Sequence, residues 1–244
     1  MLRPETRQRL DAYWAGVFGC AEAGLRPHVP AVLPRREDDG FRGVYAMELG
    51  AAPVALLSRR LIDTHASRVA AVLASGLDGG VDPWSVVFGD EVDAVVGPAA
   101  LLCADAGTFR PLPPSDAVRL LTRDDLPHAE ALRRACTPTE WEHGGSAVGH
   151  DVAAGSFAGG ELAALAGFEV WGEAIAHIAI VAHPAHRGRG HAAAAVSRVA
   201  AEALERGLVA QYRTLESNAP SLAVAQRLGF QPYARSLAVR LRGA

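Results

Sequence analysis

The 244-residue chain contains no lysine, so all 24 of its basic residues are arginine, and it contains one asparagine, Asn218. Arginine in place of lysine, together with frequent alanine, is typical of a GC-rich coding bias. Under such a bias a residue that breaks the trend stands out. Asn218 is therefore a position that any account of function has to explain.

An excess of positive charge is also missing. The formal net charge is −3, and residues 1–115 carry 11 arginines against 14 acidic residues, while the remainder carries 13 against 13. Neither half is a basic module, which removes the electrostatic argument for nucleic-acid binding. We therefore expect no nucleic-acid partner.

Cysteines and long apolar runs are scarce. Cys20, Cys103 and Cys136 are odd in number and widely spaced, which favours buried thiols in a reducing compartment over a disulfide framework. The first residues, MLRPETRQRLDAYW, have no apolar segment typical of a signal peptide. No run of about 18 uncharged apolar residues occurs, so no membrane span is expected. These absences predict a soluble, cytoplasmic, globular protein.

Residues 110–116, RPLPPSD, are the best candidate for a linker because three of the seven are proline. We therefore predict an N-terminal α/β domain over 1–115 and a second domain over 117–244. In the first domain the sequence predicts a helix at 3–23, an exposed loop at 26–40, strands at 42–49 and 53–58, a helix at 61–75, a helix with Asp82 as its N-cap, and a strand at 99–104.

The second domain shows a more regular pattern. It predicts a strand at 118–121, a helix from a Thr122–Asp125 capping box to Cys136, a one-turn helix capped by Thr139, strands at 155–158, 162–171 and 174–182, a helix at 190–206, a strand at 210–216, a helix at 219–228 and a strand at 232–241. Strands followed by a helix and then by a strand–helix–strand unit indicate an α+β domain with a mixed sheet.

The segment IVAHPAHRGRGHAAAAV, residues 180–196, carries the clearest chemistry. It predicts a strand, a short turn and a helix, with Gly188 and Gly190 allowing close approach of a ligand to the backbone. The unbonded N–H groups of the first helical turn, the helix dipole, Arg187 and Arg189 would together attract pyrophosphate. An ordinary glycine-rich turn with solvated arginines is the alternative. Walker A and Rossmann motifs are both absent.

This segment resembles the acyl-CoA motif of the GCN5-related N-acetyltransferase (GNAT) family, Gln/Arg-x-x-Gly-x-Gly/Ala, through Arg187, Gly190 and Ala192. A second family motif, Asn followed three residues later by Ala/Ser and ending in Gly-Phe, is matched from Asn218 and Ser221 to the Gly-Phe pair at 229–230. The resemblance covers roughly 117–244. The segments SNAPSLAVAQRLGF and GLVAQYRTLES are similar to one subgroup, the zwittermicin-A-resistance-like acetyltransferases.

The resemblance implies a GNAT-like, mostly antiparallel mixed sheet flanked by helices, with acetyl-CoA as cofactor. Strand 174–182 would part from strand 210–216 and leave a cleft. Pantetheine would pair with backbone groups of Ile180, Val181 and Ala182, as an added strand does. The pyrophosphate would bind at Arg187 and on the amides of Gly188, Arg189, Gly190, His191 and Ala192. Asn218 and Ser221 would contact the cofactor near its thiol.

The sequence departs from the family at the customary acid and base. The tyrosine expected seven residues after the motif asparagine is Ala225, and the frequent glutamate base falls at Ala176. Substitute catalytic candidates are His177, Glu140, Glu142 and Ser221.

Each substitute also has a plain structural reading. His177 should point to the sheet face opposite residue 176 and pack there. Ser221 suits helix capping. Glu140 and Glu142 flank Trp141, which suits either the wall of an acceptor pocket or the core. Further candidates are Glu216, acting through water, and the hydroxyls of Tyr212 and Tyr233, which nothing in their spacing singles out.

His177, His183, His186 and His191 raise the question of a metal site. Pro184 between His183 and His186 makes shared ligation from one helix doubtful, and no cysteine lies nearby. We therefore expect no metal, and we expect these histidines to flank the cofactor phosphates.

Together these features predict an acetyl-CoA-dependent N-acetyltransferase in which a primary amine of a small molecule attacks the thioester directly in a ternary complex. Residues 1–115 would line the acceptor side. The alternative is a non-catalytic acyl-CoA-binding sensor that retains the cradle without the acid and base. The sequence leaves open whether the chain forms a homodimer.

Overall fold

The computed structural model describes residues 1–36, 41–78, 80–146, 148 and 152–242. The chain divides into two compact units that interleave along the sequence. Unit 1 comprises Met1–Thr6, Leu102–Arg213 and Ala219–Gln231, and unit 2 comprises Arg7–Leu101, Thr214–Asn218 and Pro232–Ala244. The division into domains at 1–115 and 117–244 stays a prediction, and whether residues 1–115 fold independently was left open by the sequence.

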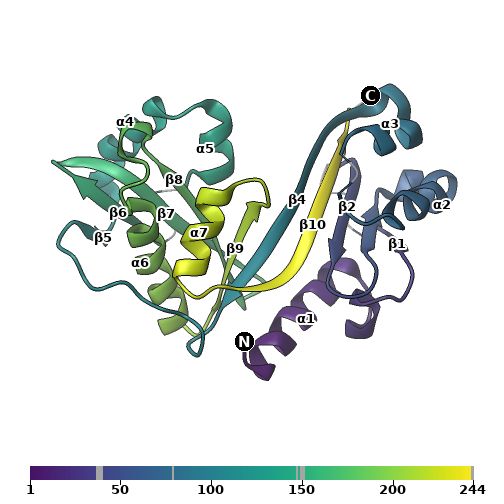
Figure 1. Cartoon of the computed structure of the whole chain (residues 1–244), viewed down its shortest axis with the longest axis horizontal. Helices are drawn as coiled ribbons and strands as arrows, with labels where there is room; N and C mark the ends of the chain where they lie inside the picture. The colour runs from purple at the N-terminus through teal and green to yellow at the C-terminus, as the bar shows by residue number, and fades with distance from the viewer. Residues whose placement is uncertain (37–40, 79, 147, 149–151, 243–244) are drawn as a thin grey trace. The chain divides into compact units, whose positions relative to one another are not determined.

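Unit 1 contains five strands in the order β9-β8-β7-β6-β5 (Figure 1). Their bounds are β5 Val118–Leu120, β6 Val152–Ala158, β7 Glu161–Trp171, β8 Ile175–Ala182 and β9 Val209–Leu215. The pairings β5–β6, β6–β7 and β7–β8 are antiparallel, and β8–β9 is parallel. The sheet is therefore mixed and mostly antiparallel, which confirms the predicted α+β class.

Helices cover both faces of this sheet. They are α4 Leu126–Ala135, α5 Pro138–Gly144, α6 His191–Glu205 and α7 Ala219–Arg227. On one face Leu132 of α4 packs in a core cluster with Leu165 and Val181 of the sheet. On the other face α6 packs on β6, β7 and β8, with Arg206 at its end lying over the ring of Phe168. Alternating side chains along each strand supply both layers.

The first residues of the chain are held to unit 1 by one buried carboxylate. Asp105 accepts hydrogen bonds from the Arg3 amide (2.8 Å) and the Thr6 hydroxyl (2.9 Å), and from the amides of Gly107 (2.9 Å) and Thr108 (3.0 Å). Burial raises the pKa of Asp105, but these four donors outweigh it and leave the pKa below its ordinary value.

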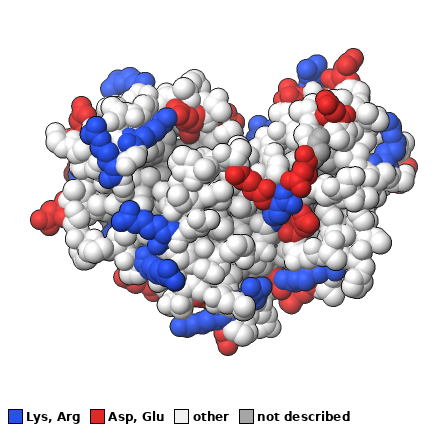
Figure 2. Space-filling view, viewed as in Figure 1, with Lys and Arg blue, Asp and Glu red and all other residues white. Residues whose placement is uncertain are grey.

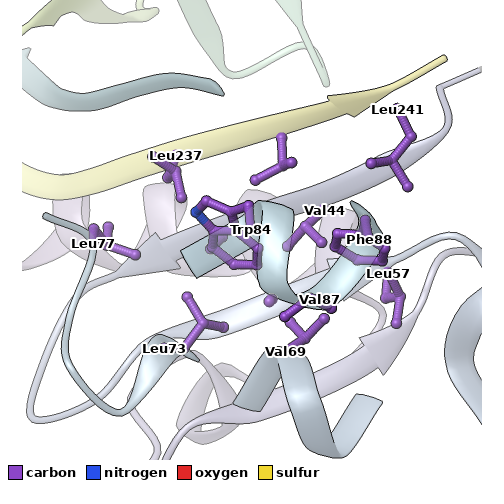
Figure 3. Close-up of a cluster of buried hydrophobic side chains, with 13 residues drawn as sticks. Val44, Leu57, Val69, Leu73, Leu77, Trp84, Val87, Phe88, Leu237 and Leu241 are labelled. Carbon is purple, nitrogen blue, oxygen red and sulfur yellow. The ribbon is translucent and has the colours of Figure 1, made fainter. Parts of the chain in front are cut away.

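Unit 2 contains the strand order β1-β3-β2-β10-β4. The strands are β1 Ala31–Pro34, β2 Gly43–Glu48, β3 Val54–Leu57, β4 Val92–Ala104 and β10 Gln231–Leu241, and the helices are α1 Pro4–Phe18, α2 Ile62–Leu73 and α3 Asp82–Phe88. Figure 3 shows its apolar core, in which Trp84 and Phe88 of α3 and Leu73 of α2 lie among sheet residues such as Leu57 and Leu237. The last strand of the chain thus completes a sheet begun near its start.

The predicted elements are present, but the first helix ends at Phe18 instead of residue 23 and β4 begins at Val92 instead of residue 99. Three further corrections concern a loop and two helix caps. The loop predicted at 26–40 contains strand β1, and residues 37–40 lie outside the described residues. Helix α3 is preceded by Val81 as its N-cap, so Asp82 lies inside the helix. Helix α5 is capped by Thr137 rather than Thr139 because the Thr137 side chain accepts from the Glu140 amide. No helix of the described chain is both long and apolar enough to cross a membrane.

Candidate functional site

The turn between β8 and α6 has the backbone geometry that anion binding requires. Gly188 and Gly190 have φ angles of 76° and 88°, and Gly190 is the N-cap of α6. A Cβ atom added at either glycine would meet nothing within 4 Å, so the backbone is accessible from outside. The first helical hydrogen bond runs from Ala194 to the Gly190 carbonyl (3.1 Å). The amides of residues 191–193 therefore precede the helical ladder and point toward a ligand.

The strand that leads into this turn parts from its neighbour. The parallel ladder between β8 and β9 runs from Ile175 and Val209 to Ile178 and Tyr212. Beyond that pair, within the described strands, residues 179–182 pair with β7 only. This part of β8 forms no ladder with β9, so an extended ligand could add along it as a strand does, in competition with Arg187 for the Ala182 carbonyl.

Arg187 in the turn is held by α5. Its guanidinium donates to Glu140 Oε1 (2.6 Å) and to the carbonyl of Ala182 (3.3 Å). The other carboxylate oxygen of Glu140 accepts from the Thr137 amide (2.9 Å) in the capping box. The Thr137 amide, followed by Arg187, holds the pKa of Glu140 below its ordinary value. A carboxylate stabilised in its charged form is a weak proton acceptor.

The other acidic candidates are placed differently. Glu142 is exposed on α5, and Trp141 between the two glutamates packs against the core cluster of unit 1. In unit 2, Glu216 pairs with Arg235 (2.7 Å). Arg235 also pairs with the carboxylates of Glu48 (3.1 Å) and Asp78 (2.6 Å).

His177 lies in a tightly packed stack on β8. Its ring lies 3.9 Å from that of Trp171 at 16°, and Gln211 Nε2 donates to its Nδ1 (3.1 Å). Burial, assisted by the charge of Arg213, lowers the pKa of His177 to about 3. The ring is therefore neutral near pH 7, and its low pKa makes it a weak base. The buried methyl of Ala176 occupies the neighbouring position, where the family usually has its glutamate.

Three histidines cluster around the turn. His186 pairs with Glu161 (3.1 Å), and its ring lies 5.2 Å from that of His183 and 5.9 Å from that of His191. His191 Nδ1 lies 2.9 Å from the hydroxyl of Ser156. Burial, and then the charges of His186 and Arg189, keep the pKa of His191 below its ordinary value. Among the described residues, no group of three or more histidine, cysteine or acidic side chains has the geometry of a metal site.

A pocket of about 280 Å³ lies next to the histidine cluster. It is lined by His128 and Leu132 of α4, by Gly160 and Glu161 at the β6–β7 turn, and by His183. None of its lining residues belongs to the glycine turn, so it does not mark the cradle itself.

Asn218 and Ser221 lie at the connection between β9 and α7. Asn218 is exposed, and its amide donates to the Leu215 carbonyl (3.0 Å). The Ser221 hydroxyl lies 2.8 Å from that of Tyr212 on β9. Ala225, at the family position for tyrosine, is fully buried. The hydroxyl of Tyr233 donates to Asp11 in unit 2 (2.7 Å).

Two contacts of this site were not foreseen from the sequence, namely Glu140 with Arg187 and Tyr212 with Ser221. Glu140 and Arg187 are 47 residues apart and no pattern links them. Tyr212 was a candidate acid without a distinguishing signal. A strand was predicted before Asn218 and a helix after it. These two assignments would have been enough to place the hydroxyls of Tyr212 and Ser221 near the start of that helix.

Charged side chains of both signs lie on both units. Figure 2 shows basic side chains of the described residues spaced apart over the face of unit 1, and a cluster of basic and acidic side chains in unit 2. The cluster around Arg235 described above is of this mixed kind.

Comparison with known proteins identifies the fold. Residues 117–230 match the family model described as Acetyltransferase (GNAT) family. A putative GNAT acetyltransferase from Novosphingobium aromaticivorans is 25% identical, with 63% of this chain and 67% of that chain covered and a TM-score of 0.51. No curated protein matches this sequence.

Two further solved structures are more distant. A GCN5-related N-acetyltransferase from Kribbella flavida is 17% identical, covers 66% of this chain and 64% of its own, and has a TM-score of 0.49. The acetyltransferase yncA from Salmonella typhimurium, solved with its cofactor acetyl-CoA, is 16% identical, covers 52% and 94%, and has a TM-score of 0.40. This chain thus spans about two thirds of the Novosphingobium and Kribbella proteins.

Acetyl-CoA is the cosubstrate of the GNAT family. The matched region contains the whole of the glycine turn, both parting strands and α7. Over residues 117–230, this chain is similar to the acetyltransferase domain of the GNAT family, and its fold is that of the family.

Proposed function

We propose that the protein is an acetyl-CoA-dependent N-acetyltransferase that moves an acetyl group to a primary amine of a small molecule. The observation that carries this proposal is the continuous path formed by residues 179–182 of β8, which form no ladder with β9, and the glycine turn at 188–190. An extended pantetheine arm followed by a pyrophosphate matches that path in shape and charge. The match of residues 117–230 to the GNAT family model supports the reaction class.

The residues of unit 1 would divide the work of binding. Backbone groups of Ile180, Val181 and Ala182 would pair with the pantetheine amides. The amides of residues 188–192 would bind the pyrophosphate, with Arg187 and Arg189 adding charge. His191, at the first position of α6, would border the phosphates.

On the acceptor side the proposal rests on direct attack. A ternary complex holds the amine beside the thioester, and positioning of two reactants alone lowers the barrier substantially. With alanine at 176 and 225 and a neutral His177, proximity and water carry more of the catalysis than in a member with a dedicated base. A small metabolite is the preferred acceptor by analogy with the zwittermicin-A-resistance-like subgroup, and that subgroup, like the cytoplasmic location, stays a prediction.

One observation favours a second candidate, a non-catalytic acyl-CoA-binding sensor. Ala176 and Ala225 are both fully buried, and neither methyl group can donate or accept a proton. A sensor would retain the cradle and need neither group.

The experiment that tests the proposal measures binding and turnover separately. Calorimetric titration with acetyl-CoA checks the cradle, and release of free CoA is then followed with a panel of small primary amines. Binding together with acetylation of at least one amine supports the enzyme. Tight binding with no turnover on any amine supports the sensor, and absence of binding contradicts both.

A further inference from the structure

His191 is the first residue of α6 and directly follows Gly190, the N-cap of that helix in the glycine turn. Its partly buried ring lies against β6, where Nδ1 is 2.9 Å from the hydroxyl of Ser156, a residue only 2% exposed. A serine hydroxyl donates to Nδ1 of a neutral imidazole and accepts from the Nδ1–H of a charged one. The ring can therefore gain or lose a proton without leaving this buried contact unpaired.

The charges nearest to His191 are mostly positive. Arg189 lies two residues earlier in the turn, and the ring of His186 is 5.9 Å from that of His191. Burial, followed by the charges of His186 and Arg189, lowers the pKa of His191, and the unbonded amides of the helix start add partial positive charge. The carboxylate of Glu161 is paired with His186 (3.1 Å), and Arg198, the next charged residue of α6, lies two turns further on. The surroundings of His191 in the unliganded protein thus oppose its protonation.

The strands beneath α6 present apolar side chains to it. Leu165 of β7 and Val181 of β8 pack on the α4 side of the sheet, so the alternate residues of these strands face α6. Those residues are Ala164, Ala166, Phe168, Ala176, Ile178 and Ile180. The described strand β6 contains no charged residue, Arg119 of β5 is paired with Asp125 just before α4, and the one charge of α7 is Arg227 at its last residue. The charge around His191 therefore comes from the turn and the helix start.

We propose that His191 takes up a proton from solvent when the pyrophosphate of acetyl-CoA binds at the glycine turn, so that the affinity for acetyl-CoA rises as the pH falls. This inference rests on the proposed function, which puts the pyrophosphate on the amides of residues 188–192 and so on the amide of His191 itself. The negative charges of the ligand offset those of Arg189 and of the helix start. The charged imidazole then becomes the favoured state, and Ser156 accepts its Nδ1–H.

The sign of the pH dependence follows from linkage. The ordinary pKa of histidine is about 6.5, and that of His191 in the unliganded protein lies below it. A bound anion raises this pKa, so the complex carries more protons than the free protein at pH values between the two. Binding of acetyl-CoA therefore tightens as the pH falls through that window. Well above the window the ring is neutral in both states and its contribution disappears.

Titration calorimetry with acetyl-CoA tests the inference, because binding heats measured at one pH in buffers of different ionisation enthalpy give the number of protons taken up. The 3′-phosphate of the ligand itself titrates near pH 6, so the wild type is compared with His191→Asn. The side-chain amide of asparagine can take the place of Nδ1 opposite Ser156, and it does not titrate. At pH 6.5 the wild type should take up about 0.3 to 0.8 more protons per ligand than the variant. Its affinity should rise about 3- to 10-fold more than that of the variant between pH 8 and pH 6.

The matched control is His65→Asn in unit 2. Nδ1 of His65 also lies close to a hydroxyl, that of Thr64 (2.7 Å), but His65 is outside the residues that match the family, so this variant should take up as many protons as the wild type. His191→Gln is a second variant without a titrating ring and should behave as His191→Asn does. Equal proton uptake by the wild type and the His191 variants overturns this inference alone. Failure of the wild type to bind acetyl-CoA overturns the proposed function as well.

Discussion

Two regions of unit 1 differ in what they are made of. The cradle at residues 188–192 is built from backbone, namely two glycines with positive φ and the amides of a helix start. The region where proton transfer and leaving-group stabilisation would occur is built from side chains on β8, β9 and α7. There the usual positions, 176 and 225, carry alanine, and the hydroxyls and imidazole belong to other residues.

The difference teaches that binding and chemistry are specified independently in this chain. A backbone cradle needs only a short contiguous motif, and substitutions outside it leave it intact. A side-chain donor can be supplied by any element that reaches the same point, as Tyr212 reaches Ser221 from β9. Retention of the cradle therefore says little about which side chain assists the reaction.

The largest expected effect concerns the backbone cradle at residues 188–192. Gly190→Asp places a carboxylate in the cradle, where a charge about 4 Å from a phosphate costs on the order of 4 kcal/mol at an effective dielectric constant near 20. Acetyl-CoA affinity should fall at least about 100-fold. Titration calorimetry on the variant and the wild type measures the change.

The matched control is Gly207→Asp, at the opposite end of α6. Gly207 has a φ of 74° and open space around its Cα, like Gly190, so the two substitutions impose similar backbone strain. Thermal unfolding of both variants should show comparable losses of stability, while only Gly190→Asp loses acetyl-CoA. Equal affinity in the two variants would show that the cradle assignment is wrong.

The sequence predicted the backbone cradle far better than it predicted the contacts among the side chains of the site. The glycine turn, the strand before it and α6 after it follow from local periodicity and from residues with restricted or permissive φ angles. The contacts of Glu140 with Arg187 and of Gln211 with His177 join residues 47 and 34 positions apart. Such contacts depend on strand order and on which face each side chain takes, and no local pattern encodes them.

The same limit explains the corrections in the fold. Thr137 and Thr139 are both acceptable helix caps by residue type, and each has a glutamate three residues later. With Thr137 as the cap, Pro138 takes the first helical position, where its fixed φ and missing N–H are tolerated. Strand β1 sits in a proline-rich stretch without alternation, and it exists through its parallel pairing with β3. Tertiary pairing decided an element that local propensity did not favour.

The second prediction concerns the side-chain region of the site, at His177 on β8. With a pKa of about 3 in the folded protein against an ordinary value near 6.5, the unfolded chain binds more protons than the folded one between those pH values. His177 therefore destabilises the fold progressively as the pH falls below 6.5. Between pH 6 and pH 4 this contribution should be about 1 kcal/mol per pH unit.

Urea unfolding of the wild type and of His177→Gln over that pH range measures the contribution. The variant should lose stability less steeply on acidification, whatever its stability at pH 7. Identical slopes would mean that His177 titrates normally, which would return it to the candidates for general base.

The smallest expected effect lies where the two regions meet, at the ion pair between Arg187 of the turn and Glu140 of α5. A pyrophosphate in the cradle has to compete with Glu140 for the guanidinium. Glu140→Gln removes the competing charge, and glutamine still serves at this position of a capping box, so α5 should remain capped. Acetyl-CoA affinity should rise about 3- to 10-fold at low salt, and less at high salt because the pair is partly exposed.

Glu142→Gln is the control, since it removes the same charge from an exposed position on the same helix and leaves Arg187 paired. Its affinity for acetyl-CoA should rise far less than that of Glu140→Gln. Weaker binding in Glu140→Gln would mean that Glu140 holds Arg187 in the orientation that the phosphate needs, so the ion pair would belong to the cradle. Stronger binding would mean that the unliganded protein keeps its cradle arginine engaged by the helix beside β8, and that cofactor entry frees the carboxylate of that helix.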